Sequence, residues 1–208
     1  QQITVVGAAG FIGSNLSNFF KKLGFKVVDI YKGYQILPQE NYGIVLYCAG
    51  VTAGFRERPF DVINAHVTNL VNWLTFSDFD KLIYFSSARI YMGNKLGLES
   101  VEDFIINRND TYNQTKILGE SICQFSKKNT AILRLSHVIG YDPNSPYFFW
   151  NVIRQFCSNS PNVSIDESPQ SKRDYIFLED IFDIIRQIIK LDKTGIYNVS
   201  SGIDVKNI

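Results

Sequence analysis

Short apolar runs alternate along this chain with longer segments in which apolar residues recur every three or four positions. The short runs are rich in Val, Ile, Leu and aromatic residues, which is typical of buried strands. Strands are predicted at residues 3–6, 25–31, 43–49, 81–85, 131–135, 163–165 and 195–199. Helices are predicted at residues 14–23, 61–76, 111–126, 148–157 and 181–191. Continuous apolar strands that alternate with helices predict an α/β fold whose parallel sheet is covered on both faces.

The turn between the first predicted strand and the first predicted helix contains Gly7, Gly10 and Gly13 in the pattern GxxGxxG. Glycine permits a tight turn and lets the backbone approach a pyrophosphate. The N-terminus of the following helix supplies N–H groups and the positive end of a dipole. The same glycines would also suit close packing of a helix on a strand. Their place after the first strand favours a dinucleotide site.

The end of the second predicted strand is expected to lie at the ribose of a bound dinucleotide. Asp29 is the only acid in this strand, but counting from Gly24 places the strand end at Tyr31, followed by Lys32. An acid at that end would favour the free 2′-hydroxyl of NAD, and a cation would favour the 2′-phosphate of NADP. The sequence leaves both cofactors open.

Tyr112 and Lys116 form a YxxxK motif in the helix predicted at residues 111–126. Residues four apart share a helix face, so the Lys116 ammonium can approach the phenol and lower its pKa from about 10. The strand at 81–85 is followed by Ser86 and Ser87, which form either a turn or hydroxyls that orient a reacting oxygen. YxxxK is common on solvated helix faces, but its position after the serine pair and the glycine turn predicts an active site.

Seven segments resemble, in the same order, motifs of the extended short-chain dehydrogenase/reductases, a group of nucleotide-sugar epimerases, dehydratases and reductases. They are GAAGFIG, YCAG, YFSSARIY, YNQTK, RLSHVIG, SKRDYIFLED and IYNVSSG. The resemblance covers essentially the whole chain and implies a Rossmann-type doubly wound parallel sheet. An NAD(P)-binding domain is expected at residues 1–140. A partial substrate-binding region is expected at 141–208, interleaved with the last Rossmann elements at 175–199. The resemblance also implies Ser87, Tyr112 and Lys116 as the catalytic set.

The strand ends and the family motifs assign the remaining site residues. Contacts with NAD or NADP are expected for Gly7, Gly10, Phe11, Ile12, Gly13, Tyr31, Lys32, Ala49, Gly50, His66, Tyr112 and Lys116. Contacts with a nucleotide-sugar substrate are expected for Ser86, Arg89, His137 and Arg173. His66 and His137 stand where the family has asparagines, and a buried histidine with satisfied hydrogen bonds is an equal alternative for His66. Arg173 suits bidentate phosphate contact or a salt bridge with Asp174, and Asp180 is expected only to cap a helix.

The residues after the serine pair narrow the expected reaction. Family members that eliminate water usually carry an Asp-Glu pair there, because an acid serves proton transfer at carbon. This chain has Ala88 and Arg89 instead, which disfavours a 4,6-dehydratase. A 4-epimerase or 4-ketoreductase needs only the Ser–Tyr–Lys set and the nicotinamide. Arg89 itself is expected either to contact a substrate phosphate or to be solvated.

The bulk composition excludes several classes of function. Hydrophobic residues make up 45% of the 208 residues, and the net charge is +1. Because the charge is near zero, neither nucleic acid nor an anionic membrane is an expected partner. Cys48, Cys123 and Cys157 are odd in number and show no CxxC spacing, which predicts free thiols and no metal site. No leader pattern opens the chain and no apolar run reaches about 18 residues. A cytoplasmic location is therefore expected.

Two functions from different classes compete. The first is an NAD(P)-dependent enzyme of polysaccharide precursor synthesis, expected to be a homodimer because the family pairs helices equivalent to residues 61–76 and 111–126. The second is a non-catalytic NAD(P)-binding regulator or scaffold, since a fold does not fix a function. Family members usually continue beyond the position of Ile208, so the substrate-binding part is expected to be either truncated or unusually small.

Overall fold

The computed structural model describes residues 1–38, 40–91, 110–145, 147–158, 164, 168 and 170–206. Its main feature is a six-stranded sheet in the order β2-β1-β3-β4-β5-β8, in which every neighbouring pair is parallel. The strands are β1 (Gln2–Val6), β2 (Lys26–Ile30), β3 (Ile44–Tyr47), β4 (Lys81–Ser87), β5 (Thr130–Leu135) and β8 (Gly195–Val199). The predicted parallel α/β sheet is therefore confirmed.

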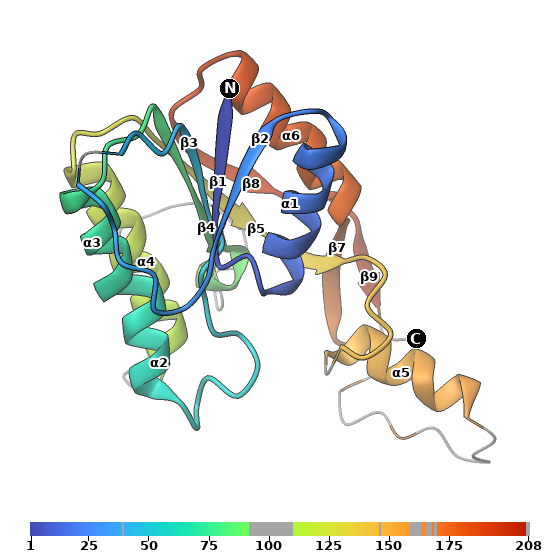
Figure 1. Cartoon of the computed structure of the whole chain (residues 1–208). Coiled ribbons are helices and arrows are strands. Elements are labelled where there is room, and N and C mark those ends of the chain that lie inside the picture. The colour runs from blue at the N-terminus through green and yellow to red at the C-terminus, as the bar shows by residue number, and fades with distance from the viewer. Residues whose placement is uncertain are drawn as a thin grey trace.

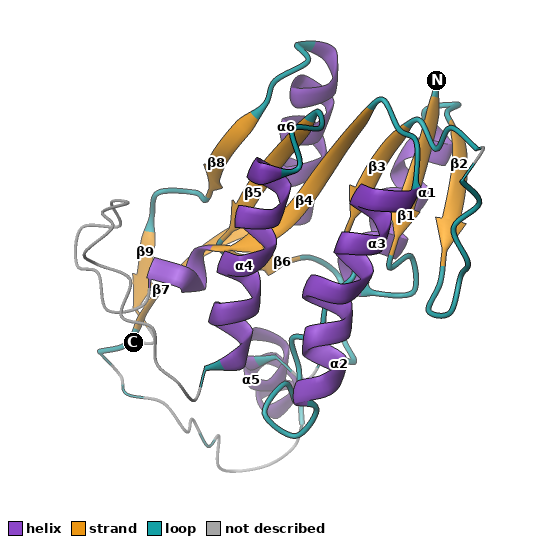
Figure 2. Cartoon of the chain, turned by 90° about the vertical axis from the view of Figure 1, so that its left-hand side faces the viewer, coloured by secondary structure: helices purple, strands orange, loops and turns teal. Residues whose placement is uncertain are grey.

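Helices cover both faces of this sheet, as Figures 1 and 2 show. One face carries α1 (Phe11–Lys22) and α6 (Leu178–Lys190). The other carries α2 (Pro59–Ile63), a π-helical turn (Asn64–Thr68), α3 (Asn69–Phe76) and α4 (Thr111–Phe125). The first three of these form one continuous helical segment, in place of the single helix predicted at 61–76. Among the described residues, no helix has both the length and the apolar character needed to cross a membrane.

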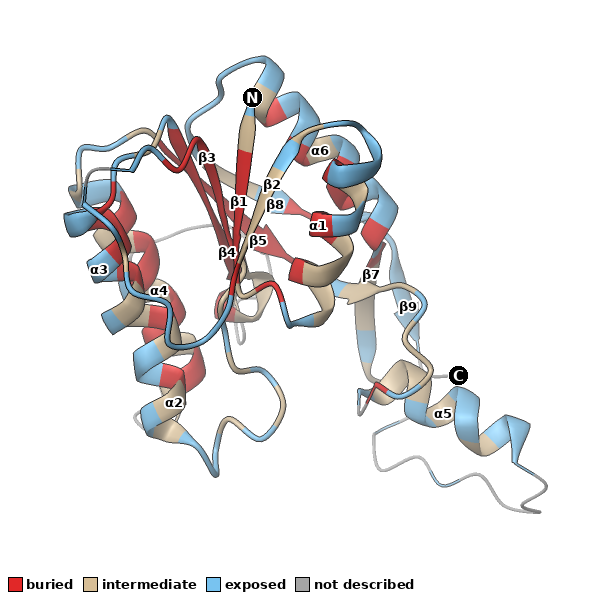
Figure 3. Ribbon diagram, viewed as in Figure 1, coloured by how far each residue is buried: buried red, intermediate tan, exposed pale blue. Residues whose placement is uncertain are grey.

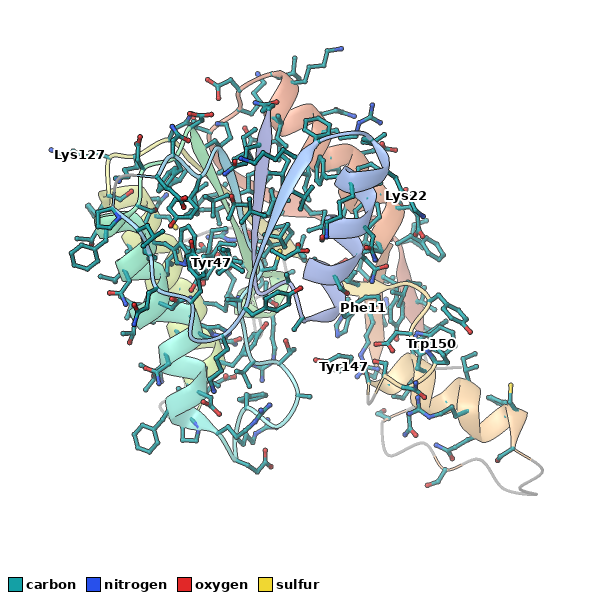
Figure 4. All side chains as sticks on the ribbon, in the orientation of Figure 1. Phe11, Lys22, Tyr47, Lys127, Tyr147 and Trp150 are labelled. Carbon is teal, nitrogen blue, oxygen red and sulfur yellow. The ribbon has the colours of Figure 1, made fainter. Side chains whose placement is uncertain are left out.

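The central strands are apolar throughout because they are buried on both faces. In β3, Ile44 and Leu46 pack in the cluster beneath α1 and α6, whereas Val45 and Tyr47 pack beneath α3 and α4. Figure 3 shows the buried residues concentrated on the sheet and on the helix faces turned toward it, and Tyr47 is labelled on the α3 side in Figure 4. Two-sided burial explains why these strands lack the polar alternation of a half-exposed sheet.

The strand order reverses between β1 and β3, because the chain leaves β1 toward β2 and then crosses back to form β3. Ligands of open α/β sheets bind outside the carboxyl ends of the strands at such a reversal. The glycine turn that follows β1 and the residues that follow β3 both lie there, and the fold thus places the predicted dinucleotide motifs at the point where a crevice is expected.

A second, three-stranded sheet follows β5, with β6 (His137–Ile139) parallel to β7 (Lys172–Phe177) and β7 antiparallel to β9 (Asp204–Lys206). Helix α5 (Phe148–Cys157) lies beside it, at the lower right of Figure 1. The sequence did not predict these strands, since two have only three residues and β7 begins with Lys-Arg-Asp. The strand predicted at 163–165 falls on residues that, apart from Ser164, lie outside the described part of the chain.

Candidate active site

The glycine turn after β1 is shaped by close backbone contacts. Gly7 has a φ of 88°, and a Cβ on it would lie 2.7 Å from the Ala49 nitrogen. A Cβ on Gly13 would lie 2.3 Å from the Gly7 carbonyl oxygen. Gly10 is the N-cap of α1, which receives no side-chain cap, and a Cβ there would approach only the Gly7 oxygen at 3.4 Å. An uncapped helix N-terminus with an open backbone approach fits a dinucleotide pyrophosphate.

The end of β2 lies beside this turn, because the N–H groups of Gly7 and Ala8 donate to the Ile30 carbonyl at 3.0 and 3.2 Å. Asp29 is directed elsewhere, since its carboxylate pairs with Lys21 of α1 at 2.5 Å. The strand ends at Ile30 rather than at Tyr31. The first side chains after it are still Tyr31 and the exposed Lys32, and among the described residues Lys32 pairs with Asp61 at 3.3 Å.

Ser87, Tyr112 and Lys116 converge from two neighbouring elements. Ser87 is the last residue of β4, and Tyr112 and Lys116 lie one turn apart at the start of α4. The side chains of Ser87 and Thr52 interact with the Tyr112 phenol and lower its pKa. The Lys116 ammonium donates to the Phe85 carbonyl at 2.7 Å and lies 5.9 Å from the centre of the Tyr112 ring. The structure therefore brings together the three residues of the predicted catalytic set.

Burial dominates the ionisation of this set, in which Tyr112 and Lys116 are 7% and 6% exposed. Burial raises the pKa of the Tyr112 phenol, and the side chains of Ser87, Arg89 and Thr52 oppose that rise. Burial lowers the pKa of Lys116 to about 8. The sequence predicted that Lys116 lowers the pKa of Tyr112. In the structure the side chains that lower the pKa of Tyr112 are Ser87, Arg89 and Thr52. The Lys116 ammonium is held instead at the Phe85 carbonyl.

His66 lies in the π-helical turn, fully buried, with both ring nitrogens bonded. Its Nε2 accepts from the Val51 N–H at 3.2 Å, so the proton is on Nδ1, which donates to the Thr115 hydroxyl at 2.8 Å. Burial, with the Lys116 cation nearby, lowers the pKa of His66 to about 2 and keeps the ring neutral. A Cβ on Gly50 would lie 3.1 Å from Nε2 and 3.8 Å from the Lys116 nitrogen. The buried, satisfied histidine thus supports the wall of the site rather than offering a free nitrogen.

Ser86 faces away from Ser87, since successive strand side chains point to opposite faces. Its hydroxyl donates to Glu120 of α4, whose carboxylate forms a buried ion pair with Arg134 of β5 at 2.5 Å. Arg134 also donates to the Tyr91 hydroxyl at 2.6 Å. The expected contact of Ser86 with substrate is not supported, because this hydroxyl belongs to a buried network behind the strand.

Arg89 is paired with protein groups rather than solvated, and its expected contact with a substrate phosphate stays a prediction. Its Nη1 donates to Asp110 Oδ1 and Asn113 Oδ1, both at 2.9 Å, and its guanidinium carbon lies 5.5 Å from the centre of the Tyr112 ring. The side chain is 28% exposed. It is therefore fixed against α4 rather than solvated, and the contacts that fix it are with protein groups.

His137 and Arg173 lie on the second sheet. The His137 ring is 5.7 Å from the Tyr175 ring, and the Arg173 guanidinium lies 4.5 Å over the Phe148 ring of α5. This part of the chain approaches the catalytic set through Tyr147, whose phenol raises the pKa of Tyr112 and which Figure 4 labels at the start of α5. No described contact joins His137 or Arg173 to Tyr112, so their expected substrate contacts stay predictions.

Two neighbouring acids have structural roles. Asp174 accepts backbone N–H groups from Ser201, Gly202 and Ile203, and so it anchors the loop after β8. Asp180 lies in the first turn of α6, whose N-cap is Phe177. The prediction that Asp180 is the cap was therefore wrong, although an acid in the first turn still favours the helix dipole.

Several residues around Tyr112 were not anticipated from the sequence. Thr52 lowers the pKa of the phenol, the Phe55 ring lies 5.5 Å from the Tyr112 ring, and Asp110 caps α4 by accepting from the Asn113 N–H at 3.1 Å. Only Asp110 carried a usable signal, because an Asp directly before a helix is a preferred N-cap. Within the described residues no group of metal-ligating side chains occurs, and all three cysteines are free, as predicted.

Comparison with known proteins adds to this geometry. The chain matches the model of the NAD dependent epimerase/dehydratase family over residues 3–200. It is 22% identical to UDP-glucose 4-epimerase of Lactobacillus helveticus, in an alignment that covers 100% of this chain and 78% of the relative.

Two solved structures have the same fold. UDP-glucuronic acid 4-epimerase from Bacillus cereus, in complex with UDP-glucuronic acid and NAD, has a TM-score of 0.79 and 21% identity over 99% of this chain and 79% of that one. TunA, an NAD-dependent NDP-hexosamine 5,6-dehydratase, has a TM-score of 0.80 and 16% identity over 99% and 77%. The likeness extends to an epimerase and a dehydratase alike, so the shared fold does not choose between these reactions.

Proposed function

Because the chain belongs to the NAD dependent epimerase/dehydratase family, we propose that it is an enzyme acting at C4 of a nucleotide-activated sugar, as a 4-epimerase or a 4-ketoreductase. The family is NAD-dependent, which confirms the prediction of a nicotinamide dinucleotide cofactor. The observation that carries the proposal is the convergence of Ser87, Tyr112 and Lys116 beside the glycine turn. This arrangement joins a proton-transfer group to a dinucleotide site.

The proposed chemistry moves a proton and a hydride from one sugar carbon and its hydroxyl. Bound nicotinamide supplies the hydride acceptor, or in the reverse direction the donor. Tyr112 takes the hydroxyl proton as phenolate or returns it as phenol, and Ser87 orients the reacting oxygen against it. Lys116 lies one helical turn away, and its ammonium donates to the Phe85 carbonyl. The backbone of Gly50 runs beside Lys116 and His66 and closes the inner wall.

The side chains around Ser87 support hydride chemistry over elimination of water. Elimination needs an acid or base at the carbon next to the carbonyl, and positions 88 and 89 hold Ala and Arg. Asp110 is the carboxylate nearby, but its ion pair with Arg89 and its hydrogen bonds outweigh burial and lower its pKa. An ionised carboxylate committed to that pair and to capping α4 is poorly suited to shuttle protons at carbon.

The substitution Tyr112→Phe tests the proposal directly. We expect kcat to fall by at least about 100-fold, the usual contribution of general acid–base catalysis, while nicotinamide binding followed by fluorescence persists. Tyr197→Phe is the matched control, because Tyr197 lies on β8 and its hydroxyl donates to the Thr194 carbonyl. Turnover of Tyr112→Phe at the parental rate would sink the assignment.

The alternative function is a non-catalytic NAD(P)-binding regulator or scaffold. A titration with reduced and oxidised nicotinamide against a panel of nucleotide sugars separates the two. Cofactor binding with no oxidation, reduction or interconversion of any sugar would favour the scaffold. The convergence of Ser87, Tyr112 and Lys116 favours the enzyme, because a scaffold has no need of a proton-transfer group at a dinucleotide site.

A further inference from the structure

Arg89 joins the end of β4 to the first turn of α4 through its backbone and its side chain. Its N–H donates to Ser87 Oγ at 3.2 Å, and its carbonyl accepts from Asn113 Nδ2 at 3.2 Å. Its Nη1 donates to both Asp110 and Asn113. Ser87 also interacts with the Tyr112 phenol and lowers its pKa, so these contacts link the strand end, the arginine and the helix.

The guanidinium also lies against the face of aromatic rings. Its carbon is 5.5 Å from the centre of the Tyr112 ring and 5.2 Å from that of Phe55. A cation in this position interacts favourably with a ring and more strongly with an ionised phenolate than with a neutral phenol. Asp110 offsets part of the charge, since it pairs with the same guanidinium nitrogen.

Several other ionisable groups of the described chain face Tyr112. Lys116 of α4 holds its ammonium at the Phe85 carbonyl, His66 of the π-helical turn is neutral, and Tyr147 before α5 raises the pKa of Tyr112. Tyr84 of β4 interacts electrostatically with Tyr112, and its own pKa is raised well above the usual range, chiefly by burial. Arg89 and Asp110 are the charged pair described above, and Arg56 also lowers the pKa of Asp110. Arg89 is thus a permanent positive charge as near to the phenol ring as the ammonium of Lys116.

We propose that Arg89 is a positioning residue for proton transfer, which holds Ser87 against Tyr112 and favours the phenolate over the phenol. The kinetic part of this proposal rests on the proposed function, whereas the ionisation of Tyr112 is measured without any substrate. Arg89 stands where the dehydratases of the family carry an acid, and this proposal gives it a role in the hydride reaction.

The test is the ionisation midpoint of Tyr112 in Arg89→Gln, Arg89→Lys and Asp110→Asn. It is read from tyrosinate difference absorbance between each protein and the same protein carrying Tyr112→Phe. We expect Arg89→Gln to raise the midpoint by about 1 pH unit because a neighbouring cation is lost. Asp110→Asn should lower it, since asparagine keeps the N-cap but leaves the guanidinium uncompensated. Arg89→Lys keeps the charge and should stay close to the parent.

Steady-state kinetics provide the second readout. For oxidation of the sugar, the limb of kcat that rises with pH should shift upward in Arg89→Gln and downward in Asp110→Asn, with KM for the nucleotide sugar little changed. Arg186→Gln is the control, because Arg186 is exposed on α6 and pairs with Asp183. An unchanged midpoint in Arg89→Gln, or a raised KM with kcat unchanged, would overturn the proposal. Absence of turnover in the parent would contradict the proposed function alone, since the absorbance titration still decides the role of Arg89.

Discussion

The residues of the site could be predicted from local spacing only where their partners are also local. Tyr112 and Lys116 are four apart on one helix, so their proximity follows from helical geometry. The ion pair of Arg89 could not be foreseen, because Asp110 lies 21 positions along the chain. Ser86 was predictable in part, since alternation along β4 already places it opposite Ser87, but its buried partner Glu120 lies 34 positions away.

His66 gives a prediction for stability against pH. Its pKa is about 2 in the folded protein, below the ordinary value of 6.5, so below pH 6.5 the unfolded chain binds a proton that the folded chain excludes. The free energy of unfolding therefore falls as the pH drops, by about 1 kcal/mol between about pH 7.5 and pH 5.5. Denaturant unfolding at the two pH values measures this loss.

The two histidines of the chain make a matched pair for this measurement. His66→Asn should be less stable at neutral pH, because hydrogen bonds to Val51 and Thr115 are weakened, but its stability should change less between the two pH values. His137→Asn removes the other histidine, on β6, and tests whether any part of the change comes from that residue. Equal pH dependence in the parent and in His66→Asn would show that His66 titrates normally.

The elements of the main sheet could be predicted because two-sided burial leaves long apolar runs, as in β3 and β5. The π-helical turn at Asn64–Thr68 could not, because one extra residue in a turn does not disturb the apolar spacing that predicted the helix. π-turns are frequent at functional sites, and this one holds His66 toward the first turn of α4. The strands of the second sheet are short and partly polar, so their pairing depends on tertiary contacts.

Gly119 sets how closely α4 packs on β4. A Cβ there would lie 2.3 Å from the Tyr84 hydroxyl and 3.2 Å from the His66 carbonyl. Glycine to alanine in a helix normally stabilises by about 1 kcal/mol, but here overpacking should reverse the sign and cost about 1–3 kcal/mol. Thermal unfolding of Gly119→Ala checks this. Adding Tyr84→Phe removes the clashing hydroxyl but leaves the ring carbon Cζ at 2.7 Å, so it should recover part of the loss, and no recovery would place the strain at another contact.

At the scale of the whole molecule, the parallel sheet followed from the order of the elements, whereas its doubly wound strand order, with the reversal at β1 and β3, was implied by the family resemblance. The second sheet is where prediction was weakest, because β6 and β9 have only three residues each. The division at residue 140 stays a prediction. The chain covers 78–79% of the length of the two 4-epimerases described above. The predicted catalytic set lies within this length, on β4 and α4.

Retention of nicotinamide during purification distinguishes the two proposed reactions, that of a 4-epimerase and that of a 4-ketoreductase. A 4-epimerase returns the hydride to the sugar that supplied it, so its cofactor need not leave between turnovers. We expect the purified protein to carry nicotinamide, measured by acid extraction and chromatography. Gly7→Ala should lose it, because the added Cβ meets the Ala49 backbone at 2.7 Å and displaces the turn. Gly24→Ala is the control, since it also has a positive φ, of 81°, but has open space around it. Protein that purifies without nicotinamide and consumes one reduced cofactor for each sugar would be a 4-ketoreductase. Equal binding by the parent and Gly7→Ala would remove the glycine turn from the site.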